Sequence, residues 1–296
     1  YMLKRRTDLA LEAAQLWQES AGEAGTLPGV ESEESTREGY PVTTVRIRDE
    51  AGARALGKPV GRYATLTMDG LARRERDAFG RAARAVAGEL TALMGSLPPQ
   101  APVLVVGLGN RAITPDAVGP QVQVHTLATR HLVAAMPEQF GAFRPVAALA
   151  AGVLGTTGME SGELVQAVCR AVRPAWVIAV DALAARSVER LCRTIQLSNA
   201  GIVPGSGVGN HRFALDEQTL GVPVAAIGVP TVVYGATLAA DLLGHEPQGL
   251  GAAGDLLVTP KDIDSQVADL SKVIGYGINL ALQPQLSVED VELLLS

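Results

Sequence analysis

Two aspartates carry the chemistry that this sequence suggests most directly. Asp116 lies in a loop that comes directly after the apolar run 102–106, and Asp181 ends the apolar run 176–180. Both acids are therefore expected in loops at the carboxyl ends of buried strands, where open α/β sheets bind their ligands. Two carboxyl groups that meet there from different strands can act as a general acid/base pair and share one proton.

Each aspartate also has a purely structural interpretation. Asp116 follows Thr114 and Pro115, which suit the N-cap and the first position of a helix, so its carboxylate could simply stabilise a helix start. Asp181 could cap a following helix or pair with Arg186. The pattern around either residue does not decide between structure and function, but two acids that face one crevice favour function.

Two glycine-rich loops are candidates for holding a substrate or an oxyanion through backbone N–H groups. The first fits the GxGxx[GA] pattern of dinucleotide folds, but no Asp or Glu occurs between Asp116 and Glu138, where such folds need an acid. The second, at 201–212, lacks P-loop spacing and is also consistent with an irregular surface turn. The candidate residues of both loops are Gly107, Gly109, Asn110, Gly205, Ser206, Gly207, Gly209 and Asn210.

A metal centre is an alternative to a metal-free acid pair. Asp116, Asp181 and His211 could meet around a divalent ion. His125 and His131 are six residues apart, a spacing that does not place them on one helical face. We expect no metal and no other cofactor, and the metal centre stays open as the alternative.

The composition narrows the class of protein. The chain has 296 residues, of which 47% are hydrophobic and 19% charged, so it can bury a large core. Its net charge of −6 gives no general attraction for nucleic acid, and no apolar run approaches the roughly 18 residues of a membrane span. Cys169 and Cys192 lack metal-site spacing and are expected to be buried structural thiols. These features favour a cytoplasmic protein that contacts neither membrane nor DNA.

Expected strands and helices alternate along the chain. Strands are expected at 42–48, 63–68, 102–107, 145–150, 175–180, 193–198 and 222–229, and helices at 8–18, 73–94, 115–134, 160–172, 184–191, 231–243 and 260–281. Residues 22–39 are rich in Glu, Ser and Gly and are expected to form a loop. The alternation predicts a single α/β domain over 1–296, with a twisted, mostly parallel sheet, helices on both faces and a small β-rich excursion at about 40–70.

Several longer motifs resemble the germination proteases of spore-forming bacteria, which degrade small acid-soluble spore proteins. The resemblance runs in order from about residue 6 to about residue 284. Its motifs include RTDLALE at 6–12, VVGLGN at 105–110, TPDAVGP at 114–120, AVDALAARS at 179–187, PGSGVGN at 204–210 and VTPK at 258–261.

This resemblance implies an atypical aspartic endopeptidase, in a fold similar to that of hydrogenase-maturation peptidases. The two essential aspartates of the family map onto Asp116 and Asp181. The resemblance also implies a zymogen that removes its own N-terminal segment, assembly as a tetramer, and action in the developing spore and spore core. Residues 1–6 would then be a propeptide remnant, and residues 285–296 an extension past the usual end.

Departures from the family pattern fall near the second glycine-rich loop. Asn199, Ala200 and Val203 stand where the resemblance leads us to expect Asp, Thr and His, and His211 replaces a usual Lys. These differences leave the substrate contacts and the regulatory state open. Two other functions also stay open: a metal-dependent peptidase related to hydrogenase maturation, and a non-enzymatic ligand-binding module.

Overall fold

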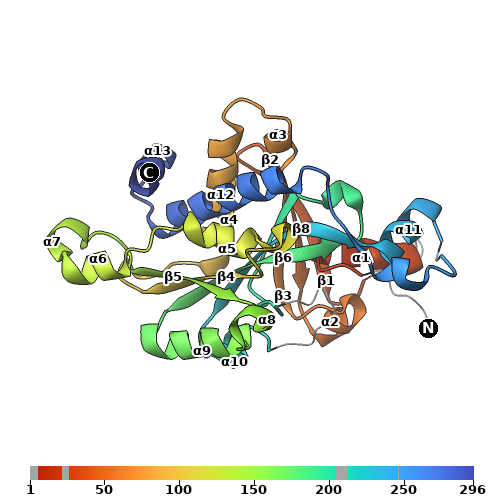
Figure 1. Ribbon diagram of the computed structural model, residues 1–296, viewed down its shortest axis with the longest axis horizontal. Helices are drawn as coiled ribbons and strands as arrows, with labels where there is room; N and C mark the ends of the chain where they lie inside the picture. Colours follow the sequence, from red (N-terminus) through yellow and green to blue (C-terminus); the bar gives the residue numbers. More distant parts are fainter. Residues whose placement is uncertain (1–5, 22–26, 205–212, 246) are drawn as a thin grey trace.

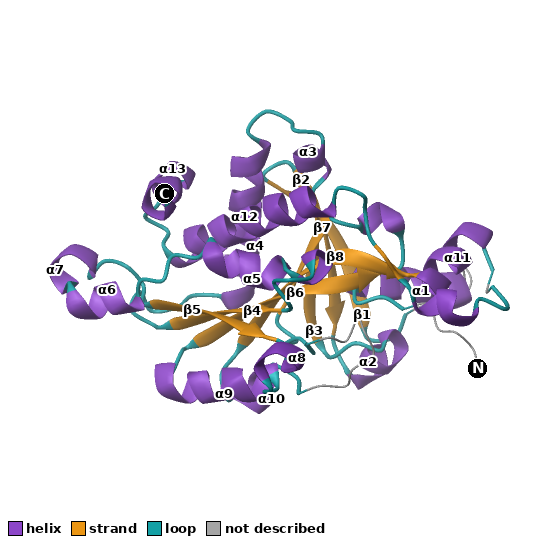
Figure 2. Ribbon diagram, in the orientation of Figure 1, coloured by secondary structure: helices purple, strands orange, loops and turns teal. Residues whose placement is uncertain are grey.

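A nine-stranded sheet with helices on both faces forms the centre of the protein, as seen in a computed structural model (Figures 1 and 2). The structure describes residues 6–21, 27–204, 213–245 and 247–296. The strand order is β1-β2-β3-β7-β8-β6-β4-β5, with β9 beside β8. No described helix combines the length and the apolar character that a membrane span requires.

The elements have the following bounds. The strands are β1 (Val30–Arg37), β2 (Tyr40–Ile47), β3 (Gly61–Thr67), β4 (Val103–Leu108), β5 (Val146–Gly152), β6 (Trp176–Ala185), β7 (Thr194–Ser198), β8 (Val224–Tyr234) and β9 (Leu257–Val258). The helices are α1 (Ala10–Ala21), α2 (Glu50–Leu56), α3 (Asp69–Ala72), α4 (Ala78–Met94), α5 (Val118–Val124), α6 (Arg130–Ala135), α7 (Pro137–Phe140), α8 (Leu154–Thr157), α9 (Ser161–Val172), α10 (Glu217–Leu220), α11 (Gly235–Leu243), α12 (Ile263–Leu282) and α13 (Val288–Leu295). Short 3₁₀ turns are η1 (Thr114–Asp116), η2 (Val188–Arg190) and η4 (Gly251–Asp255).

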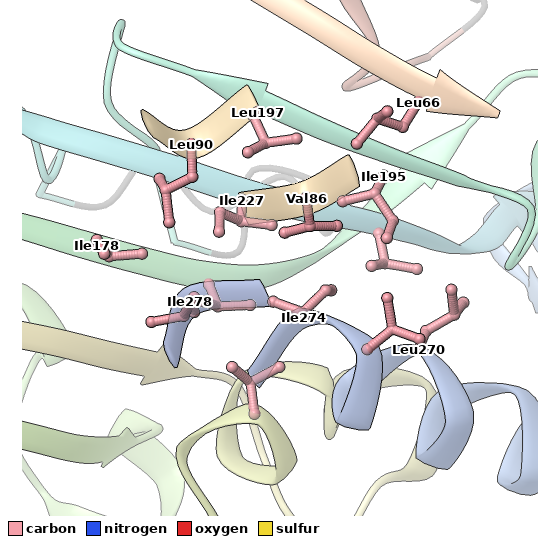
Figure 3. Close-up of a cluster of buried hydrophobic side chains, with 14 of the residues drawn as sticks. Leu66, Val86, Leu90, Ile178, Ile195, Leu197, Ile227, Leu270, Ile274 and Ile278 are labelled. Atoms are coloured by element: carbon pink, nitrogen blue, oxygen red, sulfur yellow. The ribbon is translucent and has the colours of Figure 1, made fainter. Parts of the chain in front are cut away.

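Different helices cover the two faces of the sheet. Successive side chains of the central strands point to opposite faces, and they are apolar on both. Val103 and Val105 of β4 belong to the core formed with α4, α5 and α12. Leu104 and Val106 face the other way and pack with α9. Figure 3 shows the larger core, where Ile274 of α12 lies among side chains from α4 and the strands. Burial on both faces explains why β4 is apolar throughout.

The predicted α/β class, with helices on both faces, is confirmed, but the sheet is mixed and not mostly parallel as expected. β4, β5, β6 and β8 run parallel, whereas the pairs of β1, β2, β3, β7 and β9 are antiparallel. The parallel part carries both aspartates. The β-rich segment expected at about 40–70 does not stand apart, because β3 pairs with β7, with Tyr63 opposite Ser198.

The loop predicted at 22–39 is wrong for residues 30–37, which form the edge strand β1. This strand pairs with β2 and keeps its Glu and Ser side chains in solvent. Ion pairs across the hairpin join Glu33 to Arg46 (3.0 Å) and Glu31 to Arg48 (2.5 Å). An edge strand exposed in this way has the composition of a loop, which is why the sequence pattern was misleading.

The helix predicted at 184–191 is also wrong, because β6 continues to Ala185 and only a 3₁₀ turn follows. Pairing with β8 on one side, and with β4 over the first half, keeps this alanine-rich stretch extended. In the second half of β6, which β4 does not reach, Ala184 forms two hydrogen bonds of 2.8 Å with Asp8. The predicted helix at 115–134 is divided into η1, α5 and α6, and that at 231–243 begins only at Gly235.

Both cysteines are buried and unpaired, as expected. Burial raises the pKa of the Cys169 thiol, and it raises that of Cys192 to about 12. Because the thiolate is the reactive form, we expect neither residue to be alkylated in the native protein at about pH 8, and both to react in denaturant. Mass spectrometry of treated protein checks this. Equal alkylation of native and unfolded protein would contradict it.

Candidate active site

Asp116 and Asp181 line one cavity of about 400 Å³, which lies at the carboxyl end of β4 and beside β6. The structure thus brings the two predicted acids to a single site. The remaining walls are mostly apolar and come from several segments of the chain, and they include Leu108, Ile113, Leu183, Val232 and Leu257. Charged groups that face such walls interact more strongly than they would in open water.

Asp181 lies inside β6, not in a loop after the strand as the sequence suggested. Its side chain is buried, with 5% of the residue exposed. One carboxylate oxygen, Oδ1, accepts a hydrogen bond from the Ala182 N–H (2.9 Å). No helix begins at this point, so the helix-cap interpretation does not apply. Arg186, its other suggested partner, forms ion pairs with Glu19 (2.9 Å) and Asp241 (3.4 Å).

Asp116 ends the turn η1 and closes the loop that follows β4. Its Oδ2 accepts a hydrogen bond from the backbone N–H of Asn110 (2.8 Å). Pro115 occupies the first turn as predicted, whereas Thr114 is not the N-cap, a position held by Ile113 without a side-chain bond. The backbone N–H of Asn110, which was expected to hold a substrate or an oxyanion, is thus used to orient the Asp116 carboxylate.

Glycines allow the Asp116 loop and α5 to approach β4 closely. A Cβ atom on Gly107 would lie 2.2 Å from the carbonyl oxygen of Gly119. Gly109 adopts φ +108°, and a Cβ atom there would lie 2.1 Å from the carbonyl oxygen of Asp116. Gly107 therefore makes room for the start of α5, and Gly109 lines the cavity and shapes the turn that carries Asp116.

Alanine at Gly109 is expected to reduce both stability and the activity of the site. The added Cβ would strain a positive-φ position and push against the Asp116 backbone, at a cost of about 2 kcal/mol or more. Gly57 is a matched control, because its φ is +62° and nothing lies within 4 Å of an added Cβ; alanine there should cost about 1 kcal/mol and leave activity intact. Urea denaturation and a cleavage assay compare the two variants. Equal effects on activity would contradict the prediction.

The second glycine-rich loop is outside the described residues. This applies to the candidates Gly205, Ser206, Gly207, Gly209 and Asn210, and to His211. Pro204, the last described residue before them, lines the cavity. Within the described part of the chain, no group of three or more His, Cys, Asp or Glu residues is arranged to hold a metal ion.

Two threonines connect the Asp116 loop to the sheet, and neither was among the residues predicted to belong to the site. Thr231 lies where the register between β6 and β8 shifts, and it is fully buried. Its hydroxyl donates to the carbonyl oxygen of Pro115 (2.7 Å), and the Thr259 hydroxyl donates to the carbonyl oxygen of Thr231 (2.8 Å). Thr259 belongs to the VTPK motif, whereas Thr231 was expected to begin the helix at 231–243 and in fact lies in β8.

Valine at Thr231 is expected to lower kcat by about tenfold and to cost roughly 1 kcal/mol of stability. The substitution keeps the shape but leaves the Pro115 carbonyl without its donor, so the Asp116 turn is held less firmly. Ser271→Ala is the control, because Ser271 donates to a carbonyl of α5, that of Val118 (3.3 Å), and does not line the cavity. Steady-state kinetics and thermal denaturation separate the two effects. An unchanged kcat in the Thr231 variant would show that this contact does not position the acid.

Comparison with known proteins gives consistent matches. A family profile described as "Germination protease" matches residues 10–252. The chain is 41% identical over 328 residues to the germination protease of Clostridium perfringens, covering 100% of both chains. It is 43% identical over 322 residues to that of Caldanaerobacter subterraneus subsp. tengcongensis, with 98% of each covered, and 37% identical over 350 residues to that of Bacillus cereus, with 96% and 95% covered.

Among solved structures, the [NiFe] hydrogenase maturation protease HycI from Thermococcus kodakarensis KOD1 is similar. The match has a TM-score of 0.34 and 17% sequence identity. It covers 60% of this chain and 93% of HycI.

Proposed function

The chain belongs to the germination protease family, and we propose that it is an endopeptidase that uses Asp116 and Asp181 as an acid/base pair. One observation carries this proposal: the two aspartates line the same mostly apolar cavity, one from the loop after β4 and one from the adjacent strand β6. The structural interpretation of each acid explains less. Asp181 starts no helix. The carboxylate of Asp116 accepts a hydrogen bond from the backbone N–H of Asn110, which belongs to the loop that lines the cavity.

In the proposed reaction, one carboxylate takes a proton from a water molecule as the water oxygen attacks the carbonyl carbon of the peptide bond. The other carboxyl group is protonated and donates its proton to the carbonyl oxygen. When the tetrahedral intermediate collapses, the C–N bond breaks, the departing nitrogen takes the proton that the first carboxylate received, and a hydroxyl group of the intermediate returns a proton to the second. The products are a carboxylic acid and an amine, and general acid–base steps of this kind contribute about 10²- to 10⁴-fold each. The two acids are interchangeable in this scheme.

We propose small acid-soluble spore proteins as the substrate, cleaved in the spore during germination. Family membership supports this assignment. The substrates, not the protease, would make the contacts with DNA, which fits the net charge of −6 of the chain. The cytoplasm of the developing spore and the spore core would be its location.

We also propose one peptidase domain over 1–296, synthesis as a self-processing zymogen, and a tetrameric assembly. The position of residues 7–12 supports self-processing. Hydrogen bonds hold this segment against residues 184–187, close in the chain to Asp181, so the residues that precede it start near the proposed site. Asp8 pairs with Ala184, as described above, and the buried Glu12 accepts hydrogen bonds from the backbone N–H groups of Arg186 (2.7 Å) and Ser187 (3.0 Å). Removal of an earlier segment would leave this anchor in place. Tetramer assembly rests on family membership.

Incubation with a purified small acid-soluble spore protein tests the proposed function. Fragments are identified by mass spectrometry, with and without a chelator, for the full chain and for a chain that begins at Thr7. Specific cleavage that survives the chelator supports the acid pair. Loss of cleavage in the chelator, restored by nickel or zinc, would favour a metal-dependent peptidase. Folded protein that cleaves in neither form but shows a thermal shift with ligand would be a binding module.

A further inference from the structure

The strand β5 has an outer edge that leads to the candidate active site. β5 is the last strand of the sheet and pairs only with β4 among the described strands (Figure 1). Its sequence, VAALAAG, carries no charge. The strand ends at Gly152, and the next residues, Val153 and Gly155, line the cavity together with Asp116. A chain that followed this edge would therefore arrive at the two acids.

The opposite edge of the same sheet carries charged side chains that discourage pairing with other chains, whereas β5 carries none. β1 reads VESEESTR, and its charged side chains are exposed and paired across the hairpin. Charged side chains on edge strands are a common protection against pairing with other chains. β5 lacks this protection, although it is of similar length. An unprotected edge beside a catalytic cavity indicates a surface that is kept available for pairing.

The backbone groups that point outward from β5 follow from its pairing with β4. The carbonyl oxygen of Pro145 accepts a hydrogen bond from the first residue of β4 (3.0 Å). Because backbone groups alternate between the two sides of a strand, those of Val146, Ala148 and Ala150 face outward. The Val146 N–H agrees with this, since it donates to the Thr129 hydroxyl (3.0 Å) instead of to β4. Ala148 and Ala150 thus present N–H and C=O groups to the outside of the sheet.

Large apolar side chains are exposed in the segment that follows β5 and in the cavity wall. Leu154 and Met159, which follow β5 in the chain, are 41% and 48% exposed. Ile113, which lines the cavity, is 53% exposed. Exposed apolar side chains that gather beside a binding site are typical of surfaces that contact a partner. Here they would meet the side chains of a peptide that leaves the edge of β5.

We propose that β5 binds the protein substrate as an added strand. An extended substrate segment would pair with Ala148 and Ala150 and pass over Val153 into the cavity with Asp116 and Asp181. Main-chain hydrogen bonds give affinity in this mode, and pockets for alternate side chains give specificity. The proposed occupant is an unfolded or locally extended polypeptide, because the same segment must pair with the edge of β5 and continue past Val153 into the cavity. This inference rests on the proposed endopeptidase function.

Hydrogen exchange on the complex tests the added strand. The Asp181→Asn variant is mixed with a purified small acid-soluble spore protein, and exchange is followed residue by residue. The Ala148 and Ala150 amides are expected to exchange about tenfold or more slowly in the complex. Unchanged exchange at these amides in a complex that forms would overturn the proposal. Slow exchange without substrate that depends on protein concentration would also overturn it, in favour of a second copy on the edge.

Proline at Ala148 gives an independent test, because it removes the outward N–H and proline is tolerated on edge strands. We expect kcat/KM on the protein substrate to fall about tenfold, mainly through KM. Ala148→Val keeps the N–H and is the matched control, with kcat/KM near that of the wild type. Wild-type kcat/KM in the proline variant would overturn the proposal, and the exchange measurement decides if that variant does not fold. If the wild type cleaves normally but the β5 amides stay unprotected, only the added strand fails; if it cleaves nothing, the proposed function fails.

Discussion

Asparagine in place of Asp181 is expected to lower kcat on a protein substrate by about a thousandfold or more and to leave KM nearly unchanged. Asparagine keeps the shape of the side chain but can neither take a proton from water nor donate one as a carboxylic acid. The same result is expected for Asp116→Asn. Because the two acids would act as a unit, the double variant should be little slower than either single variant. Single-turnover cleavage followed by mass spectrometry measures these rates.

Asp216→Asn provides the control for this pair. Asp216 caps α10 by accepting a hydrogen bond from the Thr219 N–H (2.8 Å) and does not line the cavity with the two acids. Asparagine is an equally good N-cap, so this variant should keep its stability and its activity. A folded Asp116→Asn or Asp181→Asn variant that retained more than about a tenth of the wild-type kcat would remove that residue from the acid/base pair.

Alanine in place of Glu89 is expected to cost about 3 kcal/mol of stability. Glu89 of α4 is buried, with 2% of the residue exposed. Its two carboxylate oxygens bind Arg37 Nε of β1 (2.6 Å) and an Nη atom of Arg62 in β3 (2.6 Å). Removal of the carboxylate would leave two arginines without their shared partner, one of them only 22% exposed. Urea denaturation gives the change in free energy of unfolding.

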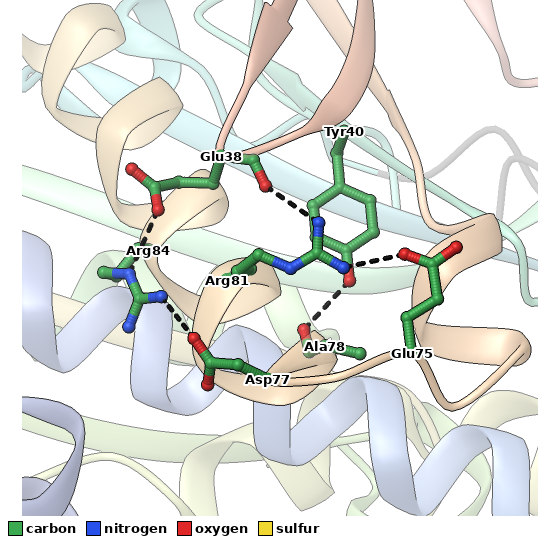
Figure 4. A network of polar contacts seen from close by, with 7 residues as sticks. All are labelled: Glu38, Tyr40, Glu75, Asp77, Ala78, Arg81 and Arg84. Carbon is green, nitrogen blue, oxygen red and sulfur yellow. Dashed lines mark hydrogen bonds and ion pairs between the residues drawn. The ribbon is translucent and has the colours of Figure 1, made fainter.

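An exposed network on the same helix supplies the comparison for Glu89. Figure 4 shows Arg84 between Glu38 and Asp77, and Arg81 beside Tyr40. These ion pairs are open to solvent, so Arg84→Ala should cost less than about 1 kcal/mol. A cost for Glu89→Ala no larger than that of Arg84→Ala would show that the buried carboxylate does not hold α4 to the sheet.

Local patterns in the sequence were sufficient to locate the central strands and the loop of Asp116, but they placed Asp181 after β6 and not within it. Val103 to Val106 form a short apolar run of the kind that a strand buried on both faces requires, and Asp116 lies in the loop that follows it. The resemblance to the family mapped its two essential aspartates onto the same pair, Asp116 and Asp181. Local sequence patterns are informative in this part of the chain because strands such as β4, β5 and β8 are each followed in the chain by a helix.

Features that depend on distant contacts could not be predicted. β6 extends past Asp181 because β8 and the N-terminal segment around Asp8 pair with it, and neither is visible in the local sequence. Thr231 contacts Pro115, which is remote in the chain, so nothing near Thr231 indicates its place beside the acid. The strand at 30–37 is exposed to solvent and rich in Glu and Ser. A loop would have the same composition, so the sequence does not indicate a strand.

The pairing of β3 with β7 has a consequence for how the chain folds. Tyr63 lies opposite Ser198, so the outer edge of β3 has no partner until β7 has been synthesised, although β1, β2 and β3 can pair with one another earlier. At ordinary rates of translation this delay is on the order of ten seconds, during which the edge of β3 has no neighbour. Sheets built on such distant pairings fold slowly, and their waiting edges are prone to aggregation. We therefore expect refolding yield to fall steeply with protein concentration, and chaperones that cover nascent strands to improve recovery.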